Sequence, residues 1–487
     1  MSGVSVQVDQ HVLQSAPVDL APQLENCFWF DEVEASYDVS GVSGHLPGWL
    51  RGTWFVNGPA RFELGGKRYR HWLDGDGMVC ALRLADDGIR FTNRFVRTRK
   101  WRDETEAGRF LYRAFGTAFP EDRLRRNVML EPPVNVSVYP YFGRLLAFGE
   151  QTLPYELDFV TLETRGEYDF GSKLNEVTPF SAHAKFDGAL LNFGIAFSAS
   201  SPMLNVYECD PGGRLVRRRY PLRHQYSLHD FGFTPNHVQF FLSPLLMKFE
   251  RFWQERISVM ESLSWEPELG SRILVVPRTG NSDGAFTVEV GAGYCLHVIN
   301  CFERGSSLTM DVLLLDAPVY PEYQPLPDLF ATVPRARPFR YNIDLESRAL
   351  AGATSMDYAQ SPDFPTIDPA RAGRAYSDFW MLGISRAGMR GRKFFDQLAH
   401  GSWEAGGVHD VYQTPPGEYL CSEPAFVSSP HNPDEAVVIC QHCMPARRAS
   451  AIVIFDAYAV RNGPLASLPL RHPVHPGFHS SFAGVRL

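Results

Sequence analysis

The stretch Ser227-Leu-His-Asp-Phe-Gly-Phe-Thr-Pro-Asn-His-Val-Gln-Phe-Phe241 places one histidine, His229, directly before an apolar run with the pattern of a β-strand. Three other histidines, His183, His297 and His479, lie in similarly apolar or Gly/Pro-punctuated stretches far apart along the chain. A strand-rich fold with converging strands can bring such residues to one axis, and neutral imidazoles suit iron, zinc or copper alike. We therefore expect these four histidines to meet at a single metal ion.

The β-strand signal covers the whole chain. From Leu46 onward, short apolar runs end at Gly, Pro, Asn or Asp, and the clearest are Arg51–Pro59, Arg144–Phe148, Ala189–Phe193, Arg272–Pro277, Phe286–Val290, Met310–Leu315, Ala436–Cys440 and Ala451–Phe455. No Ser/Gly-rich or charge-rich linker separates two halves, so we expect one all-β domain over residues 26–487 with helical insertions. Residues 1–25 are polar and unpatterned and are expected to form a loose N-terminal arm.

Three segments are predicted to be helical. Leu245–Leu263 carries apolar residues at helical spacing, and shorter helices are predicted over Thr105–Phe115 and Arg392–His400. We expect the 245–263 helix to cap the core. A second hypothesis is that its apolar face dips into a membrane and collects a lipid-soluble substrate.

Length, composition and charge exclude several classes of protein. With 487 residues, 44% of them hydrophobic, the chain can bury a large core, and 35 Phe, 19 Tyr and 9 Trp suit both β-sheet surfaces and an apolar ligand tunnel. A net charge of -8 argues against nucleic acid as a partner. No secretory signal and no run of about 18 uncharged apolar residues is visible, so we expect a cytoplasmic protein, at most peripherally membrane-associated.

A divalent ion held by four imidazoles keeps its full charge, so carboxylates are expected behind the histidines. Glu150 and Glu423 qualify because both stand in apolar, strand-like surroundings. The pair Cys440 and Cys443 has zinc-knuckle spacing but no second pair, and we interpret it as core. Asp74-Gly-Asp-Gly77 lacks the later ligands of a calcium loop and is interpreted as a tight turn.

An ordered set of motifs resembles the carotenoid cleavage oxygenases. The motifs are Asn57-Gly-Pro59, Tyr69-Arg-His-Trp-Leu-Asp-Gly-Asp-Gly-Met-Val79, Glu150 with Leu153-Pro-Tyr-Glu-Leu157, Ser181-Ala-His-Ala-Lys185, Leu228-His-Asp-Phe231, Leu296-His-Val-Ile-Asn300, Ser422-Glu-Pro424 and Gly477-Phe-His479. The resemblance implies a seven-bladed β-propeller with a helical cap over one end. It also implies one Fe(II) on the axis, bound by His183, His229, His297 and His479, with carboxylates behind them at Glu150, Asp363 and Glu423.

Two positions depart from the family pattern. Asp363 stands where family members generally carry Glu, so we expect its hydrogen bond to a ligating imidazole to be lengthened, bridged by water or restored by a backbone shift. Val136 stands beside the metal where many cleaving members carry Thr. At this position the chain is similar to the visual-cycle isomerase, a relative that does not cleave its substrate with oxygen. Val136 is therefore our candidate for the substrate or oxygen pocket.

The resemblance implies an Fe(II)-dependent dioxygenase that uses O2 to cleave a conjugated C=C bond of an apolar polyene, a carotenoid or apocarotenoid, into two carbonyl products. Cleavage of stilbenes ranks lower: family members that act on stilbenes are thought to hold the phenol with Lys and Tyr, and no lysine occurs between Lys100 and Lys173. Isomerisation or ester cleavage without oxygen is a second alternative, suggested by Val136. A propeller that binds an apolar ligand or a partner without catalysis is a third.

Overall fold

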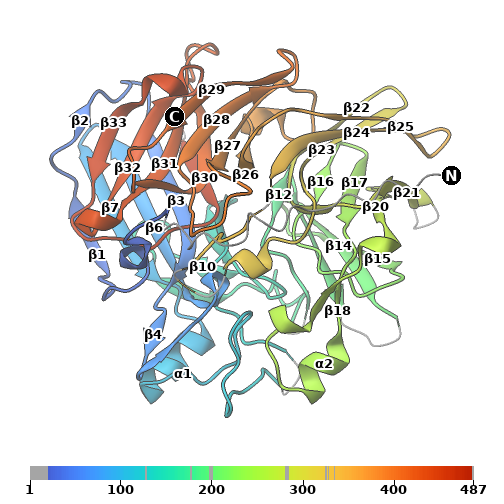
Figure 1. The fold of residues 1–487 in the computed structure, drawn as a ribbon, viewed down its shortest axis with the longest axis horizontal. Coiled ribbons are helices and arrows are strands. Elements are labelled where there is room, and N and C mark those ends of the chain that lie inside the picture. The colour runs from blue at the N-terminus through green and yellow to red at the C-terminus, as the bar shows by residue number, and fades with distance from the viewer. Residues whose placement is uncertain are drawn as a thin grey trace, which may run out of the picture.

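Seven antiparallel sheets make up the body of the protein. The computed structural model describes residues 20–126, 129–175, 178–196, 201–279, 284–323, 326, 328–333 and 335–484. In these residues five sheets have four strands and two have five, arranged as the blades of a seven-bladed β-propeller (Figure 1). The predicted all-β propeller is confirmed, and each of the eight apolar runs singled out in the sequence forms part of a strand.

The first blade joins the two ends of the described chain. Its strands, in sheet order, are β1 (Ala35–Asp38), β7 (Gly88–Phe95), β6 (Asp76–Ala85), β3 (Gly52–Ala60) and β34 (Ser480–Gly484). The C-terminal strand β34 pairs antiparallel with β3 over Gly52↔Gly484 to Val56↔Ser480. Because this pairing closes the ring, the C-terminal histidine at position 479 is held close to strands formed early in the sequence.

The other six blades follow one another along the chain. The second blade has β8 (Ser137–Tyr141), β9 (Arg144–Phe148), β10 (Tyr155–Leu157) and β11 (Thr164–Glu167), and the third has β12 (Lys185–Phe186), β13 (Leu190–Ala196), β14 (Met203–Cys209) and β15 (Leu215–Pro221). The fourth has β16 (Gly232–Phe233), β17 (His237–Leu242), β20 (Ser271–Pro277) and β21 (Phe286–Gly291), and the fifth has β22 (Tyr294–Arg304), β23 (Ser307–Leu315), β24 (Ala336–Asp344) and β25 (Ala349–Ser355). The sixth has β26 (Ser361–Thr366), β27 (Asp378–Ile384), β28 (Gln397–Ser402) and β29 (Gly407–Gln413), and the seventh has β30 (Tyr419–Ser428), β31 (Ala436–Met444), β32 (Ala449–Asp456) and β33 (Pro464–Pro469), extended by β2 (Ser43–Gly44).

The α-helices are short and lie on the same side of the molecule, below the blades in Figure 1. The two α-helices of the described residues are α1 (Arg99–Ala107) and α2 (Phe249–Gln254). Two small sheets accompany them: β4 (Glu63–Leu64) with β5 (Lys67–Arg68), and β18 (Leu245–Met247) with β19 (Leu263–Trp265). Short 3-10 helices cover Leu24–Cys27, Trp72–Asp74, Met260–Ser262, Pro267–Leu269, Tyr320–Tyr323, Pro369–Arg371, Pro445–Arg447 and Val460–Asn462. Neither α-helix of the described chain is long and apolar enough to span a membrane.

The predicted helix bounds were wrong in all three cases. The 245–263 segment is α-helical only in α2, because its two ends pair with each other as β18 and β19 and Arg256 adopts a positive φ of 55°. The helix expected over 105–115 lies earlier, because Thr98 caps it and Gly108, at φ 61°, ends it. Residues 392–400 are not helical, and their C-terminal part begins β28, which pairs with β27.

The N-terminal boundary also differs from the prediction. Residues 1–19 of the predicted arm lie outside the described residues. Ala21 and Leu24 are fully buried, so the folded body begins before residue 26.

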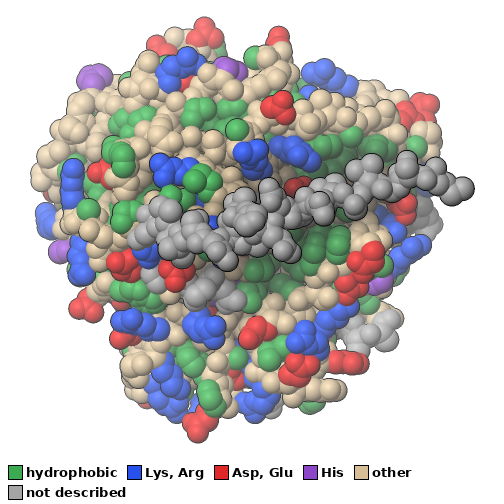
Figure 2. All heavy atoms as spheres, viewed as in Figure 1, with side chains coloured by type: hydrophobic (Ala, Val, Ile, Leu, Met, Phe, Trp, Pro, Cys, Tyr) green, Lys and Arg blue, Asp and Glu red, His purple; other side chains and the backbone are tan. Residues whose placement is uncertain are grey.

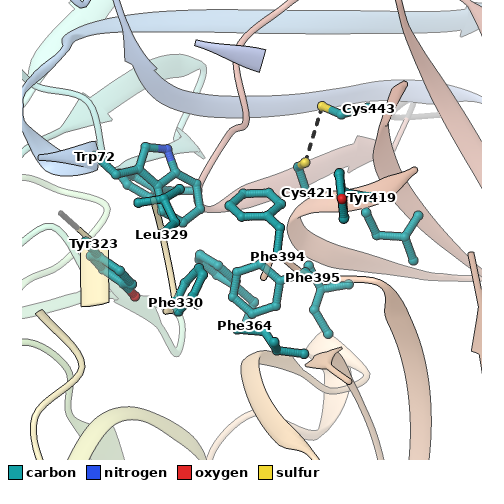
Figure 3. Packing of buried hydrophobic residues seen from close by; sticks show 14 of the residues in the cluster. Trp72, Tyr323, Leu329, Phe330, Phe364, Phe394, Phe395, Tyr419, Cys421 and Cys443 are labelled. Atoms are coloured by element: carbon teal, nitrogen blue, oxygen red, sulfur yellow. Dashed lines mark hydrogen bonds between the residues drawn. The ribbon is translucent and has the colours of Figure 1, made fainter. Parts of the chain in front are cut away.

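One large hydrophobic cluster of the core is dense in aromatic side chains (Figure 3). Trp72, Phe330, Phe394 and Phe395 pack edge-on or tilted, with ring centroids 5.2 to 6.5 Å apart. Cys440 and Cys443 belong to the same cluster, and Cys443 Sγ lies 3.3 Å from Cys421 Sγ on the neighbouring strand. Both thiols are buried, which agrees with their interpretation as core residues.

Candidate metal centre

All seven blades contribute one side chain each to a cluster on the axis. His183 precedes β12, His229 precedes β16, His297 lies in β22 and His479 precedes β34. The other three blades supply the acids Glu150, Asp363 and Glu423, the first after β9 and the others in β26 and β30. The histidines lie at the inner strands of four separate blades, where converging strands bring distant positions together.

The four imidazoles converge on one point. One ring nitrogen from each lies within 4.8 Å of those of the other three. His183 Nε2 lies 2.8 Å from His229 Nε2, and the imidazole centroids are 4.3 to 6.5 Å apart. His297 Nε2 is buried and has no hydrogen-bond partner. Because a buried imidazole nitrogen without a partner is costly, the cluster fits a cation at its centre.

Three of the imidazoles are backed by carboxylates at their outer nitrogens. Contacts to Nδ1 are 2.8 Å for His229 with Glu150, 2.5 Å for His297 with Asp363, and 3.0 Å for His479 with Glu423. A proton on Nδ1 that is donated to a carboxylate leaves the Nε2 lone pair directed inward. Asp363 and Glu423 therefore fix the tautomer in which imidazole acts as a metal ligand, whereas Glu150 approaches His229 closely without hydrogen-bond geometry.

Each of the three acids stands next to a non-glycine residue in the left-handed region of φ. Gln151 follows Glu150 with φ 56°, Phe364 follows Asp363 with φ 51°, and Ser422 precedes Glu423 with φ 67°. The strands β26 and β30 also shift register at Asp363 and Glu423. Such strained backbone persists only where the surroundings enforce it, and it concentrates at functional sites.

His183 differs from the other three histidines. Its Nδ1 lies 3.7 Å from Asp230 Oδ1, too far for a direct hydrogen bond. Asp230 is ion-paired at 2.8 Å with Lys185. Asp230 and Lys185 both stand in motifs recognised in the sequence, but no role was predicted for either. The signal in the sequence was an acid directly after a histidine that precedes an apolar run.

Burial decides most of the protonation states in the cluster. It lowers the pKa of His183 and His479 well below the ordinary value, so both imidazoles are neutral near pH 7. It raises the pKa of Glu423 to about 7. Burial also opposes charge on Asp363, but attraction to His297 outweighs it and leaves the pKa of this carboxyl below its usual range.

An aromatic wall supports the histidines from the core side. The Phe364 ring lies 5.5 Å from that of His297 and 5.3 Å from that of His479, and it packs on Phe395 at 5.5 Å (Figure 3). These apolar contacts restrict the imidazoles to a narrow range of orientations.

A partly open cleft leads to the cluster. Val136, Glu150 and His229 lie in its wall, so the position singled out in the sequence borders the site. Most of the remaining lining is apolar and includes Leu73, Phe115, Ile195, Leu228, Met247, Phe252 and Leu263. The cleft therefore suits an elongated apolar ligand.

Lys100 and Arg113, the basic residues that line the cleft, are paired with acids. Lys100 Nζ lies 2.9 Å from Asp76 and 2.9 Å from Glu104, and all three side chains are almost fully buried. Arg113 is paired with Asp122 at 2.9 Å. Lys100 thus belongs to an internal ion-pair network, which also explains the Asp74-Gly-Asp-Gly77 motif through Asp76. In the same motif, a Cβ at Gly77 would lie 2.0 Å from the Val134 carbonyl oxygen.

Comparison with known proteins now identifies the family. A family model described as retinal pigment epithelial membrane protein matches residues 29–484. The chain belongs to this family, the carotenoid oxygenases. The predicted membership and enzyme class, an oxygenase of the carotenoid cleavage family, are confirmed.

Three curated relatives illustrate the range of the family. Apocarotenoid-15,15'-oxygenase of Synechocystis sp. is 27% identical over 470 residues, covering 92% of this chain and 94% of the relative. Isoeugenol monooxygenase of Pseudomonas nitroreducens is 28% identical over 485 residues, covering 94% and 97%. Lignostilbene-alpha,beta-dioxygenase isozyme III of Sphingomonas paucimobilis is 28% identical over 476 residues, covering 91% and 93%.

Solved structures agree with the fold. Cobalt-substituted Synechocystis apocarotenoid oxygenase superposes with a TM-score of 0.87 at 25% identity, covering 95% of this chain and 98% of that one. The likeness therefore extends over nearly the whole propeller.

Proposed function

We propose that the protein is an Fe(II)-dependent dioxygenase that cleaves a conjugated C=C bond of a carotenoid or apocarotenoid. The observation that carries this proposal is the convergence of four imidazoles, one of which, that of His229, lies in the wall of an apolar cleft. Membership in a family whose relatives include an apocarotenoid oxygenase supports the substrate class.

His183, His229, His297 and His479 would hold one iron ion per chain. The fit rests on the donor set: four imidazole nitrogens converge, and His297 Nε2 is buried without a partner. Neutral nitrogen donors suit ferrous iron, which would supply the activation of dioxygen when bound.

The chain's own residues prepare the site. Asp363 and Glu423 hold the protons at the Nδ1 atoms of His297 and His479, and together with Glu150, 2.8 Å from His229 Nδ1, they would offset the charge of a dication. The apolar cleft wall excludes water and aligns an alkene beside the histidines. In the balanced reaction one C=C bond and the O–O bond break and two C=O bonds form, so no external reductant is consumed.

Cleavage of stilbenes or related phenylpropenoids is the second candidate, because two of the relatives act on isoeugenol and lignostilbene by name. A phenol needs a polar partner in the cleft. Lys100 is the lysine that lines the cleft, and two carboxylates already occupy its ammonium. The lysine thought to hold the phenol of a stilbene is therefore not available at Lys100, and on this ground we favour a polyene.

We also propose that the protein is cytoplasmic and contacts a membrane peripherally. Phe249 and Phe252 of α2 line the cleft, and Trp253 on the same short helix is 54% exposed. An apolar substrate dissolved in a bilayer could reach the cleft along this helix.

A substrate panel tests the proposed function. The iron-loaded protein is incubated in detergent with a carotene, an apocarotenal, a hydroxystilbene and isoeugenol, and products are identified by mass. We expect two aldehyde or ketone fragments from a polyene, and none from the variant His297→Ala. His400→Ala is the matched control, because His400 is also buried in a blade but bonds Asp378 at 2.9 Å. Fragments from the phenols alone, or a polyene changed only in geometry, would overturn the proposal.

A further inference from the structure

One carboxylate connects three of the histidine-bearing segments. Asp230 directly follows His229, and its side chain is 3% exposed. Its Oδ1 lies 2.8 Å from Lys185 Nζ and accepts the Phe231 N–H at 2.8 Å. Its Oδ2 accepts the Val298 N–H at 2.8 Å. Lys185 is two residues beyond His183, and Val298 is next to His297, so the contacts of Asp230 reach three blades.

These contacts fill a gap in the pattern of the centre. His229, His297 and His479 each have a carboxylate at hydrogen-bond distance from Nδ1, whereas His183 Nδ1 faces Asp230 at 3.7 Å. At this distance the carboxylate attracts a proton on Nδ1 without a direct hydrogen bond. His183 is thus oriented by charge and by the backbone that carries it.

The cation at Lys185 gives Asp230 a partner. A buried carboxylate without a partner is unstable, and a lone ammonium close to a metal dication would repel it. Joined at 2.8 Å, the two side chains form a neutral pair and tether the 183–185 segment to the 229–230 segment.

We propose that Asp230 is the positioning residue for His183, and that Lys185 both tethers and neutralises it. This inference rests on the proposed metal centre. A merely structural ion pair would hold the blades together without affecting how the fourth imidazole meets the metal. If Asp230 positions His183, its loss changes metal affinity and ligand geometry. If the ion pair is only structural, its loss changes stability alone.

Titration with Co(II), followed by its visible absorption, tests the role of Asp230. The metal-free protein is compared with the variants Asp230→Asn, Lys185→Met and their double variant. We expect Asp230→Asn to bind Co(II) about 10- to 100-fold more weakly, because the carboxylate near His183 is lost and the ammonium is left unpaired. The double variant should regain part of this affinity, because it lacks the unpaired ammonium.

Lys185→Met keeps the inference testable if Asp230→Asn does not fold. Lys185 is 26% exposed, so its replacement is better tolerated, and loss of the tether should shift the Co(II) bands. Glu303→Gln is the matched control, because Glu303 contacts His237 at 2.8 Å outside the centre and should leave both affinity and spectrum unchanged.

The outcomes separate the two proposals. If the unmodified chain binds no Co(II), the proposed metal centre fails. If it binds Co(II) and Asp230→Asn binds it equally well, or Lys185→Met leaves the spectrum unchanged, only the positioning role is overturned. A double variant no tighter than Asp230→Asn would overturn the neutralising role of Lys185.

Discussion

His297 Nδ1 lies 2.5 Å from Asp363 Oδ1, although Asp363 is one methylene shorter than the Glu expected at this position. A shift of register within β26, with Phe364 at φ 51°, brings the Asp363 backbone close enough for direct contact. The contact is direct, so the hydrogen bond is neither lengthened nor bridged by water, and the irregular backbone at Phe364 accompanies it.

We predict that Asp363→Asn weakens metal binding by about 10- to 100-fold, because the amide cannot balance the charge at His297. Asp363→Glu should not improve on the native residue. Tyr323 Oη already lies 3.5 Å from Asp363 Oδ2, so the extra methylene has little room. Co(II) titration measures both variants. Tighter binding by Asp363→Glu would contradict the view that the backbone compensates for the short side chain.

Ser422→Gly should raise the free energy of unfolding by about 1 kcal/mol, because glycine removes the cost of a left-handed φ at this position. The Ser422 hydroxyl is buried without a hydrogen-bond partner, so its removal adds no penalty. Urea unfolding measures the change. Ser429→Gly is the control. Ser429 is also buried, but its hydroxyl accepts backbone hydrogen bonds, so its replacement by Gly should lower the free energy of unfolding. Equal effects at both positions would refute strain at Ser422.

Val136→Thr tests the one position that links this chain to the isomerase. Val136 is 3% exposed and packs in an apolar cluster, so replacing one of its methyl groups by a hydroxyl should lower the free energy of unfolding by about 1–3 kcal/mol. The identity of the products should not change. A native chain that only isomerises its substrate, together with a Val136→Thr variant that cleaves it, would contradict the proposed reaction.

Acid stability should depend on Glu303. Burial opposes its ionisation, but the hydrogen bond to His237 and its other partners outweigh this and lower the pKa of Glu303 from 4.5 to about 2. A lowered pKa stabilises the folded state above pH 4.5, and this contribution is lost as the pH falls through 2. We therefore expect Glu303→Gln to lower Tm at pH 7 and to have little effect near pH 2. A difference in Tm that does not shrink with acid would refute this assignment.

Membrane contact through α2 predicts that Trp253→Ser reduces binding to phospholipid vesicles, measured by co-sedimentation. Met389 is the control, because it is similarly exposed, at 51% against 54% for Trp253, but lies outside α2. Met389→Ser should leave binding unchanged. On the face shown in Figure 2, acidic and basic side chains are interspersed, so this face offers no large area of one charge to a membrane. Equal binding by both variants would argue against α2 as the contact.

The strands and the histidines were predictable because both follow from local pattern. Apolar runs such as Arg272–Pro277 are long enough to be strands and too short to be helices, and His229 stands at the start of such a run. The interruption of the helix predicted over 245–263 could not be foreseen, because it comes from the pairing of β18 with β19, which overrides the helical spacing of the apolar residues.

The positions with a strained backbone could not be predicted from the sequence. Phe364 and Ser422 are not residue types that favour a positive φ, so nothing at these positions indicates a left-handed backbone. Asp230 was visible as an acid after His229, but its connection to Lys185 and Val298 depends on blades meeting in space.

The most direct test of the central claim is the fate of dioxygen. The iron-loaded protein is incubated with a polyene that it consumes, under 18O2, and the fragments are trapped by rapid reduction before their carbonyl oxygens exchange with water. The proposed function predicts one heavy oxygen atom in each of the two fragments. Fragments without label, or an intact polyene with altered geometry, would contradict oxidative cleavage at the four-histidine centre.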